Sequence, residues 1–310
     1  MTMAPEIGQC SPAWDSLLAG TLLVCTLTGT PGNLLSLAYF YSNRRMTHFF
    51  RQLHIAVCCI DFFICCAHLP VAASLFSDRY PALFGEEVIC SLWAAGFMFL
   101  QKISMFLVML LSVCRCFSIV YPDKRLNKRR VVLTIPFFVT LLMAHETMVF
   151  IGSGKEVSYF FDIAHCLLYG EEVSDMSWYT VDKILHGLEV GIIPLVCFTS
   201  FILCVVKLRS ASLTESSRAR NKEAAVTVTM FTGLFLVCNL PFFLITVLEY
   251  VDMTREDGQY PGPMFRNNFM FWYSWTLSRV VFTVLNATFN PVLYFYRIPG
   301  VKEWIVKLFK

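Results

Sequence analysis

The stretch QKISMFLVMLLSVCRCFSIVYP, from Gln101 to Pro122, joins a long apolar run to a single arginine that stands between two cysteines. A helix needs about 20 mostly apolar residues to cross the hydrocarbon core of a membrane, and this run is long enough. Arg115, between Cys114 and Cys116, has no acidic residue near it in the stretch. The stretch therefore predicts a membrane span, and the sequence Cys114-Arg115-Cys116 at its end is a candidate for a redox or metal site, a membrane-edge anchor or part of a switch.

The rest of the chain repeats this apolar pattern. Its 310 residues are 56% hydrophobic, with a mean hydropathy of +0.60, which exceeds the usual apolar share of soluble domains. Backbone groups in lipid must find partners within their own segment, so each span is expected to be a helix. Residues 1–310 are therefore predicted to form one all-α membrane domain, a seven-transmembrane helix bundle. The expected spans cover approximately residues 17–41, 53–76, 88–120, 131–151, 184–206, 224–250 and 269–296.

Lysine and arginine are unevenly divided between the connections. If the N-terminus is outside, the inner segments hold eighteen of them, with Arg115 at the inner end of the third span included, and the outer segments hold five. Basic residues gather on the cytoplasmic side of membrane proteins, so the N-terminus is predicted outside and the C-terminus inside. The outer segments are correspondingly acidic, which either attracts a cationic ligand or only reflects the same topology rule. The inner basic residues are interpreted as topology determinants and lipid-headgroup contacts, and nucleic acid is not an expected partner.

A short amphipathic helix is expected after the last span, over residues 299–309. Its apolar residues recur at helical spacing, with charged residues on the opposite side. This pattern is typical of a helix that lies on a membrane surface, here the inner leaflet.

The chain has thirteen cysteines, and most of them lie within the expected spans. The four in CCIDFFICC, from Cys58 to Cys66, lack a histidine and the ligand spacing of a metal site. They are interpreted as small apolar residues. Cys90 and Cys166 differ, because both are expected on the outer, oxidising side, where a disulfide between them would tie the outer loop to the third span.

Ionisable groups within a span are costly and mark functional positions by default. Asp61 lies in the middle of the second span. Polar residues of three other spans could share a cavity with it that holds water or a small cation: Asn33, Ser104, Asn286 and Asn290.

A second group of ionisable residues lies on the third, fourth and fifth spans. Lys102 and Glu189 are expected to pair as a structural contact, with His145 or Glu146 nearby.

These features together resemble the rhodopsin-like (class A) G-protein-coupled receptors, and the resemblance runs from Gly32 to Phe309. The spacing of 25 residues from Cys90 to Arg115 is usual for that family. Its other motifs occur in order on the matching spans: Gly32-Asn33, Asp61, Cys90 with Cys166, CRCFSIVYP at the Asp-Arg-Tyr box, Pro194, CNLP at Cys238–Pro241, and NPVLY at Asn290–Tyr294.

The chain departs from the family pattern at several positions that take part in receptor activation. Cys114 stands where the family has the acid that pairs with the arginine, and Cys116 replaces the tyrosine. Asn239 replaces the tryptophan of the sixth span, and the fourth span lacks its tryptophan. Arg115 is therefore expected to be held less firmly at rest than in other members.

The resemblance implies a plasma-membrane receptor that binds an extracellular ligand and activates a heterotrimeric G protein. The implied switch residues are Arg115, Pro241, Asn290, Pro291 and Tyr294. The resemblance also implies a sodium ion in the network of Asn33, Asp61, Ser104, Asn286 and Asn290, although a water-filled network without an ion fits the same residue types. No other metal or cofactor is expected.

The ligand is constrained by two absences in the sequence. Phe97 stands seven residues after Cys90, where amine receptors carry an aspartate, which disfavours the biogenic amines. Residues 269–296 contain no lysine for a retinal Schiff base, which excludes a light receptor. Positions that match the family's ligand pocket are Phe97, Met98, Gln101, His186, Phe242, Phe243, Thr246, Glu249 and Thr276, of which some aromatic ones are expected to be plain interhelical packing.

Glu249 and the acidic outer segments favour a basic or amidated peptide, as for a neuropeptide receptor. One alternative is a chemosensory or lipid small-molecule receptor of the same fold. A second alternative is a transporter or ion pathway that uses Asp61, Lys102 and Glu189. No arrangement of nucleophile and base supports an enzyme.

Overall fold

The computed structural model describes residues 12–43, 48–68, 87–121, 128–152, 176–209, 226–227, 229–241, 243–244, 247–248, 251, 269–298 and 300–308. For some helical residues, including Cys90, only the backbone is described.

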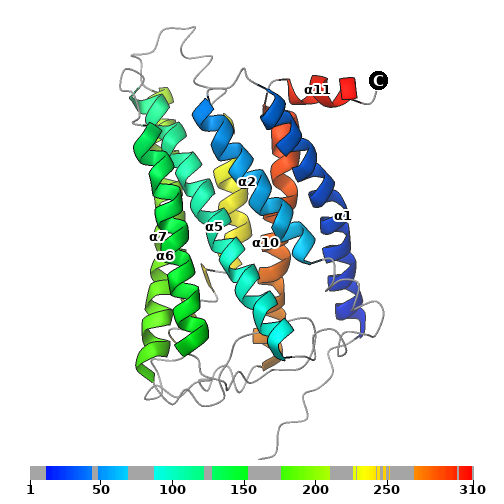
Figure 1. The fold of residues 1–310 in the computed structure, drawn as a ribbon, viewed down its shortest axis with the longest axis vertical. Helices are drawn as coiled ribbons and strands as arrows, with labels where there is room; N and C mark the ends of the chain where they lie inside the picture. The colour runs from blue at the N-terminus through cyan, green and yellow to red at the C-terminus, as the bar shows by residue number, and fades with distance from the viewer. Residues whose placement is uncertain are drawn as a thin grey trace, which may run out of the picture.

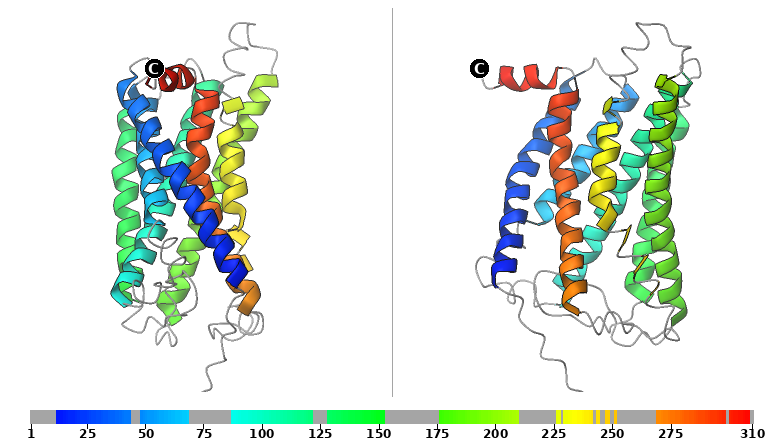
Figure 2. Two further views of the ribbon diagram at one scale, coloured as in Figure 1. Left: turned by 90° about the vertical axis from the view of Figure 1, so that its right-hand side faces the viewer. Right: turned by 180° about the vertical axis from the view of Figure 1, so that it is seen from behind.

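The described chain forms a bundle of helices that run side by side, with one short helix lying across an end of the bundle (Figure 1). This end is named the α11 end below. The helices along the bundle are α1 (Pro12–Ser42), α2 (His48–Ala67), α5 (Glu87–Val120), α6 (Lys128–Gly152), α7 (Met176–Arg209), the helix Thr229–Pro241 and α10 (Phe269–Arg297); the crossing helix is α11 (Val301–Leu308). Seen from behind, the helix Thr229–Pro241 lies between α7 and α10 (Figure 2).

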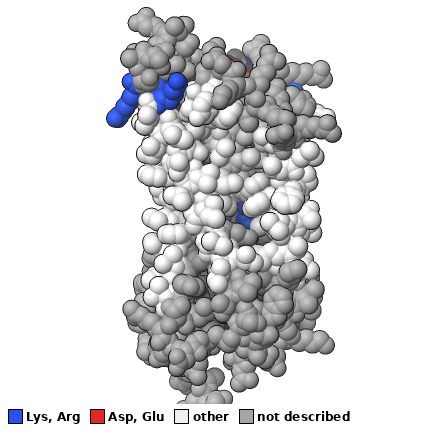
Figure 3. Space-filling model, turned by 90° about the vertical axis from the view of Figure 1, so that its left-hand side faces the viewer, with Lys and Arg blue, Asp and Glu red and all other residues white. Residues whose placement is uncertain are grey.

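The apolar character of these helices fits a membrane. By length and composition alone, three helices of the described chain can cross one: Ala19–Ser42, Phe49–Ala67 and Gly96–Val120. Shorter apolar helices are Leu133–His145, Gly191–Lys207 and Thr229–Pro241. On one long side of the bundle, basic side chains gather at the α11 end and the middle is almost free of charge (Figure 3).

The helices differ from the expected spans mainly at their ends. α5 and α10 begin and end within a residue of the expected limits, whereas α2 begins five residues early, at His48, and α7 eight residues early, at Met176. Hydropathy marks the part of a helix that lies in lipid. The backbone hydrogen bonds continue beyond that part, so the helices extend past the spans that hydropathy predicts.

Helix α1 packs closely on α2 and α10 at Gly29. A β-carbon on this glycine would lie 2.5 Å from Cys65 Sγ and 2.8 Å from Thr288 Oγ1. Only a residue without a side chain allows the three helices to approach this closely. Thr288 uses the proximity, because its hydroxyl donates to the Cys25 carbonyl over 3.2 Å.

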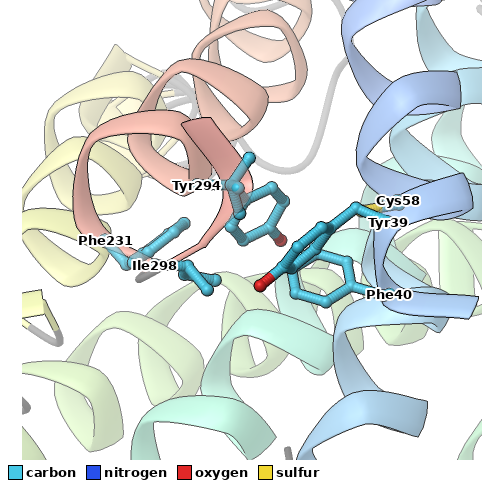
Figure 4. Close-up of a cluster of buried hydrophobic side chains, with 7 residues drawn as sticks. Tyr39, Phe40, Cys58, Phe231, Tyr294 and Ile298 are labelled. Atoms are coloured by element: carbon cyan, nitrogen blue, oxygen red, sulfur yellow. The ribbon is translucent and has the colours of Figure 1, made fainter. Parts of the chain in front are cut away.

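The turn from α10 into α11 depends on Gly300, whose φ of 89° favours glycine. The turn brings Trp304 of α11 against Tyr39 of α1, edge to face at 5.8 Å between ring centroids. Tyr39 belongs to a buried aromatic cluster at this end of the bundle, in which Phe40, Tyr294 and Phe231 come from three different helices (Figure 4). α11 is thereby fixed to the membrane helices by apolar contacts.

Candidate functional site

The carboxylate of Asp61 is fully buried in α2 and joins three helices. Ser104 of α5 donates its hydroxyl hydrogen to Asp61 Oδ1 over 3.0 Å. Asn290 of α10 donates from Nδ2 to Asp61 Oδ2 over 2.7 Å. A buried charge is tolerated only with such partners, so each oxygen of the carboxylate takes one donor.

The other two members of the expected polar network, Asn33 and Asn286, are buried as well but have different contacts. Asn33 of α1 donates from Nδ2 to the backbone oxygens of Gly29, over 2.9 Å, and Ala287, over 3.0 Å. Its side-chain oxygen is buried without a hydrogen-bond partner. Asn286 of α10 is buried as well. Asn33 therefore fastens α1 to α10 and still offers an acceptor oxygen inside the bundle.

Two buried histidines extend this polar line along α2, and they were missed from the sequence. His54 and His68 lie seven residues before and after Asp61, which places all three on one face of the helix. The Nδ1 atom of His54 lies 2.7 Å from the Phe50 carbonyl oxygen, and that of His68 lies 2.8 Å from the Ile64 carbonyl oxygen. The spacing of seven residues was the signal that could have found them.

Arg115 lies on α5 near the α11 end, half-buried. Its guanidinium carbon lies 4.2 Å from the centroid of the Phe50 ring on α2. Within the described residues, no ion pair holds it. Cys114 beside it is buried in an apolar cluster with Phe49, Leu53 and Leu111, so it behaves as an apolar residue.

The helix Thr229–Pro241 contacts α5 and α10 on the same half of the bundle. The hydroxyls of Ser112 and Thr232 lie 3.2 Å apart and share a hydrogen bond. The rings of Phe231 and Tyr294 lie 5.2 Å apart between centroids (Figure 4). The Tyr294 hydroxyl is buried and has the Cys58 thiol of α2 as a weak hydrogen-bond partner, so a group that a different packing brings near could replace that contact.

The two switch prolines lie on different helices. Pro291 is inside α10, and a β-carbon on Gly32 would lie 3.0 Å from its Cβ. Pro241 is half-buried at the last residue of the helix Thr229–Pro241. Gly32 thus allows α1 to lie against the proline of α10.

Four of the expected ligand-pocket residues have described side chains. Phe97 is buried, with its ring edge to face against His68 at 4.8 Å. Met98 and Phe243 pack on a buried apolar cluster that includes Met105. Gln101 is 2% exposed, and neither polar atom of its amide has a hydrogen-bond partner among the described residues. Gln101 is therefore the member of this set with unmet hydrogen-bonding capacity.

The remaining predicted residues lie outside the described side chains. They are His186, Phe242, Thr246, Glu249 and Thr276 of the expected pocket, and Cys90 and Cys166 of the expected disulfide.

The buried lysine of α5 has a partner on α6. Lys102 Nζ lies 3.3 Å from Nδ1 of His145. The side chains of Glu146 and Glu189, the other expected neighbours, lie outside the described residues. The structure thus brings together two of the four ionisable groups that were expected here.

The cysteines of the described chain lie apart from metal-binding geometry. Among the described residues, no group of three or more His, Cys, Asp or Glu side chains could hold a metal ion. Cys116 packs in an apolar cluster with Ile119 and Cys204. This agrees with an apolar role for the two cysteines that flank Arg115.

The geometry so far is a helical bundle with a buried carboxylate that links α2, α5 and α10, and an arginine at the end of α5. The sequence pattern described as "7 transmembrane receptor (rhodopsin family)" matches residues 32–294 of this chain. The chain belongs to the rhodopsin family of seven-transmembrane receptors. This membership makes it a multi-pass membrane receptor, in a family that implies an extracellular ligand and a G-protein partner. It confirms that the protein is a receptor and not an enzyme, and it replaces the alternative of a transporter or ion pathway.

Known relatives of the receptor are distant and similar over most of their length. G-protein coupled receptor 183 of Rattus norvegicus is 24% identical over 294 residues, covering 92% of this chain and 79% of that protein. Trace amine-associated receptor 4 of Mus musculus is 21% identical over 291 residues, covering 88% of this chain and 78% of that protein. The crystal structure of squid rhodopsin has the same fold, with a TM-score of 0.74 at 16% identity over all of this chain and 90% of that one.

Proposed function

We propose that this receptor binds an extracellular ligand, activates a heterotrimeric G protein, and uses Arg115 as the residue that the G protein engages. The N-terminus would lie outside and the C-terminus inside, so the α11 end faces the cytoplasm. The observation that carries the proposal is the position of Arg115, which lies five residues before the end of α5 at the α11 end and has no ion pair among the described residues.

The contacts of the helix Thr229–Pro241 support this reading. Its contacts at this end, among the described residues, include a hydroxyl pair, Ser112 with Thr232, and a ring contact, Phe231 with Tyr294. An outward movement of the helix would break both without disturbing the Asp61 network on the neighbouring helices. A ligand drives such a movement only if it binds the moved packing more tightly than the resting one.

The test is nucleotide exchange on purified G proteins by the receptor in lipid nanodiscs. Wild-type receptor is expected to raise the exchange rate above that of empty nanodiscs, and Arg115→Ala is expected to abolish the rise. A matched control is Arg51→Ala, since Arg51 is also a basic residue near the α11 end of the bundle, in the first turn of α2. The proposal fails if no G-protein subtype responds, or if Arg115→Ala and Arg51→Ala behave alike.

Two ligand classes have support. Glu249 and the acidic outer segments favour a basic or amidated peptide. A small neutral molecule with a hydrogen-bonding group is favoured by Gln101, whose buried amide lacks partners. Some relatives are named for trace amines, but Phe97 offers a cation no carboxylate.

One screen separates the ligand classes. Peptide and small-molecule libraries would be applied to wild-type receptor, Glu249→Gln and Gln101→Leu, with nucleotide exchange as the readout. A peptide ligand loses potency mainly in Glu249→Gln, and a small neutral ligand mainly in Gln101→Leu. If a small amine activates the wild-type receptor and still activates both variants, neither the peptide class nor the small neutral class is correct.

A sodium ion is proposed as the one bound ion. Asp61 provides a buried carboxylate, and Ser104 and Asn33 provide oxygens with unused lone pairs nearby. These are the oxygen ligands that a hard cation takes, so the residues fit the ion. When bound, the cation would neutralise the carboxylate and steady the resting packing of α2, α5 and α10.

A further inference from the structure

Arg115 has an aromatic partner in place of an acidic one. Its guanidinium lies over the ring of Phe50, at 4.2 Å from the centroid. A guanidinium within about 6 Å of a ring centroid is attracted by the negative face of the ring. The position before the arginine, which holds an acid in the family pattern, is here Cys114, so the ring supplies an attraction that no ion pair supplies within the described part of the chain.

The Phe50 ring is fixed by its own surroundings. It packs edge to face on Phe49 at 5.4 Å. It also lies against the apolar cluster of Phe49, Leu53, Leu111 and Cys114. Cys114 therefore helps to hold the ring over which its neighbour Arg115 lies, although it makes no charged contact itself.

Two helices contact α5 in the region of Arg115, one fixed and one proposed to move. The fixed one is α2, which carries Phe50 and which Asp61 ties to α5 and α10. The other is the helix Thr229–Pro241, bonded to α5 through Ser112, one turn before Arg115. The ring therefore draws the guanidinium toward the fixed part of the bundle.

We propose that Phe50 is the positioning residue that holds Arg115 in the resting packing, in the role that an acid before the arginine has in the family pattern. This inference rests on the proposed function, in which Arg115 is the residue that the G protein engages. Release of Arg115 from the ring accompanies activation, and loss of the ring face raises activity without ligand.

The competing explanation is that Phe50 only fills apolar space. The two explanations differ in their dependence on residue 114. If the ring holds Arg115, an aspartate at 114 takes over that role and makes Phe50 dispensable. If Phe50 is packing alone, its loss has the same effect whichever residue stands at 114.

Four receptors test this in the nucleotide-exchange assay without ligand, at matched amounts of folded receptor: wild type, Phe50→Leu, Cys114→Asp and the double variant. Phe50→Leu is expected to raise basal exchange roughly two- to fivefold, the range for a weak cation–π contact. In the Cys114→Asp background the same substitution is expected to have no comparable effect. An equal rise in both backgrounds, or no rise in either, overturns the inference.

Two further variants separate position from stability. Phe50→Tyr keeps the ring face and is expected to retain most of the restraint. Phe49→Leu removes the neighbouring ring of the same cluster, and it is expected to lower thermal stability without a matching rise in basal exchange. A rise in Phe49→Leu as large as that in Phe50→Leu would assign the effect to packing.

A readout without G protein makes the contact testable by itself. In arginine-labelled receptor, the ring current of Phe50 shifts the Arg115 side-chain NMR signal upfield; Arg115→Lys identifies the signal. The shift is expected to disappear in Phe50→Leu and to persist in Phe49→Leu. A persistent shift in Phe50→Leu overturns the inference, whereas the expected NMR result together with no exchange by any receptor overturns the proposed function and leaves the contact standing.

Discussion

Asn290 of α10 donates a hydrogen bond to the buried carboxylate of Asp61 on α2 over 2.7 Å, across 229 residues of sequence. Ser104 of α5 donates to the other oxygen. The carboxylate thus connects α2, α5 and α10 through two hydrogen bonds. The packing of these three helices therefore depends on the groups and ions that stabilise the carboxylate.

Sodium is expected to lower basal activity through this carboxylate. In the wild-type receptor, sodium chloride should reduce basal nucleotide exchange relative to N-methylglucamine chloride at equal ionic strength, because the cation binds the resting packing more tightly. Asp61→Asn keeps the size of the side chain and removes its charge, so the two salts should then act alike. An equal response to both salts in the wild type would indicate a water-filled network.

Close packing at Gly29 is expected to limit stability. Gly29→Ala forces a β-carbon against Cys65 and Thr288 and should cost about 1–3 kcal/mol, typical of overpacking. Gly20→Ala is the matched control on the same helix, because a β-carbon at Gly20 meets nothing within 4 Å. The measurement is the midpoint of thermal unfolding in nanodiscs, and equal midpoints for the two variants would contradict the packing argument.

The residue before Arg115 is expected to set basal activity. Cys114→Asp supplies the charged partner that Arg115 lacks, so basal nucleotide exchange should fall below that of the wild type. Cys114→Ser is the control, since it changes polarity without adding charge and should leave Arg115 as it is. Equal basal exchange in wild type and Cys114→Asp would refute the prediction.

Gln101 is expected to lower the stability of the ligand-free receptor and to contribute to ligand binding. Both polar atoms of its buried amide lack partners, and an unsatisfied buried polar group costs about 1–3 kcal/mol. Gln101→Leu should therefore raise the unfolding midpoint of the ligand-free receptor and weaken activation by a ligand that bonds to the amide. Met105→Leu, an apolar exchange on the same helix outside the expected pocket, should do neither. A lower midpoint in Gln101→Leu would show that the amide has partners.

The bundle could be predicted from sequence because hydropathy and the requirement for paired backbone groups act within each segment. The grouping of Asp61 with Ser104 and Asn290 also followed from the sequence, since costly groups in lipid must find one another. The ends of the helices could not be predicted in this way. At His48 and Met176 the helices continue into surroundings where an apolar pattern is no longer required.

Phe50 escaped prediction for a different reason. A phenylalanine in an apolar helix is ordinary packing unless a cation lies over its ring, and that depends on the distance between α2 and α5. His54 and His68 were overlooked because each was considered singly. Their spacing of seven residues from Asp61 places them on the same buried face, a pattern that the sequence already contained.

The bond from Asn33 to the Ala287 carbonyl spans 254 residues and connects the first helix of the chain to the last one in the bundle. During synthesis, α1 enters the membrane long before its partner on α10 exists. Until then the amide of Asn33 has only partners on α1 and α2, among the described residues the Gly29 carbonyl and, 3.9 Å away, Cys65 Sγ. The surface around Gly29 then has nothing from α10 to pack against. Completion of the final span is therefore the step that closes the bundle. Chains that end before it would expose the polar surface of α1 around Gly29 and Asn33 to the quality-control machinery of the cell.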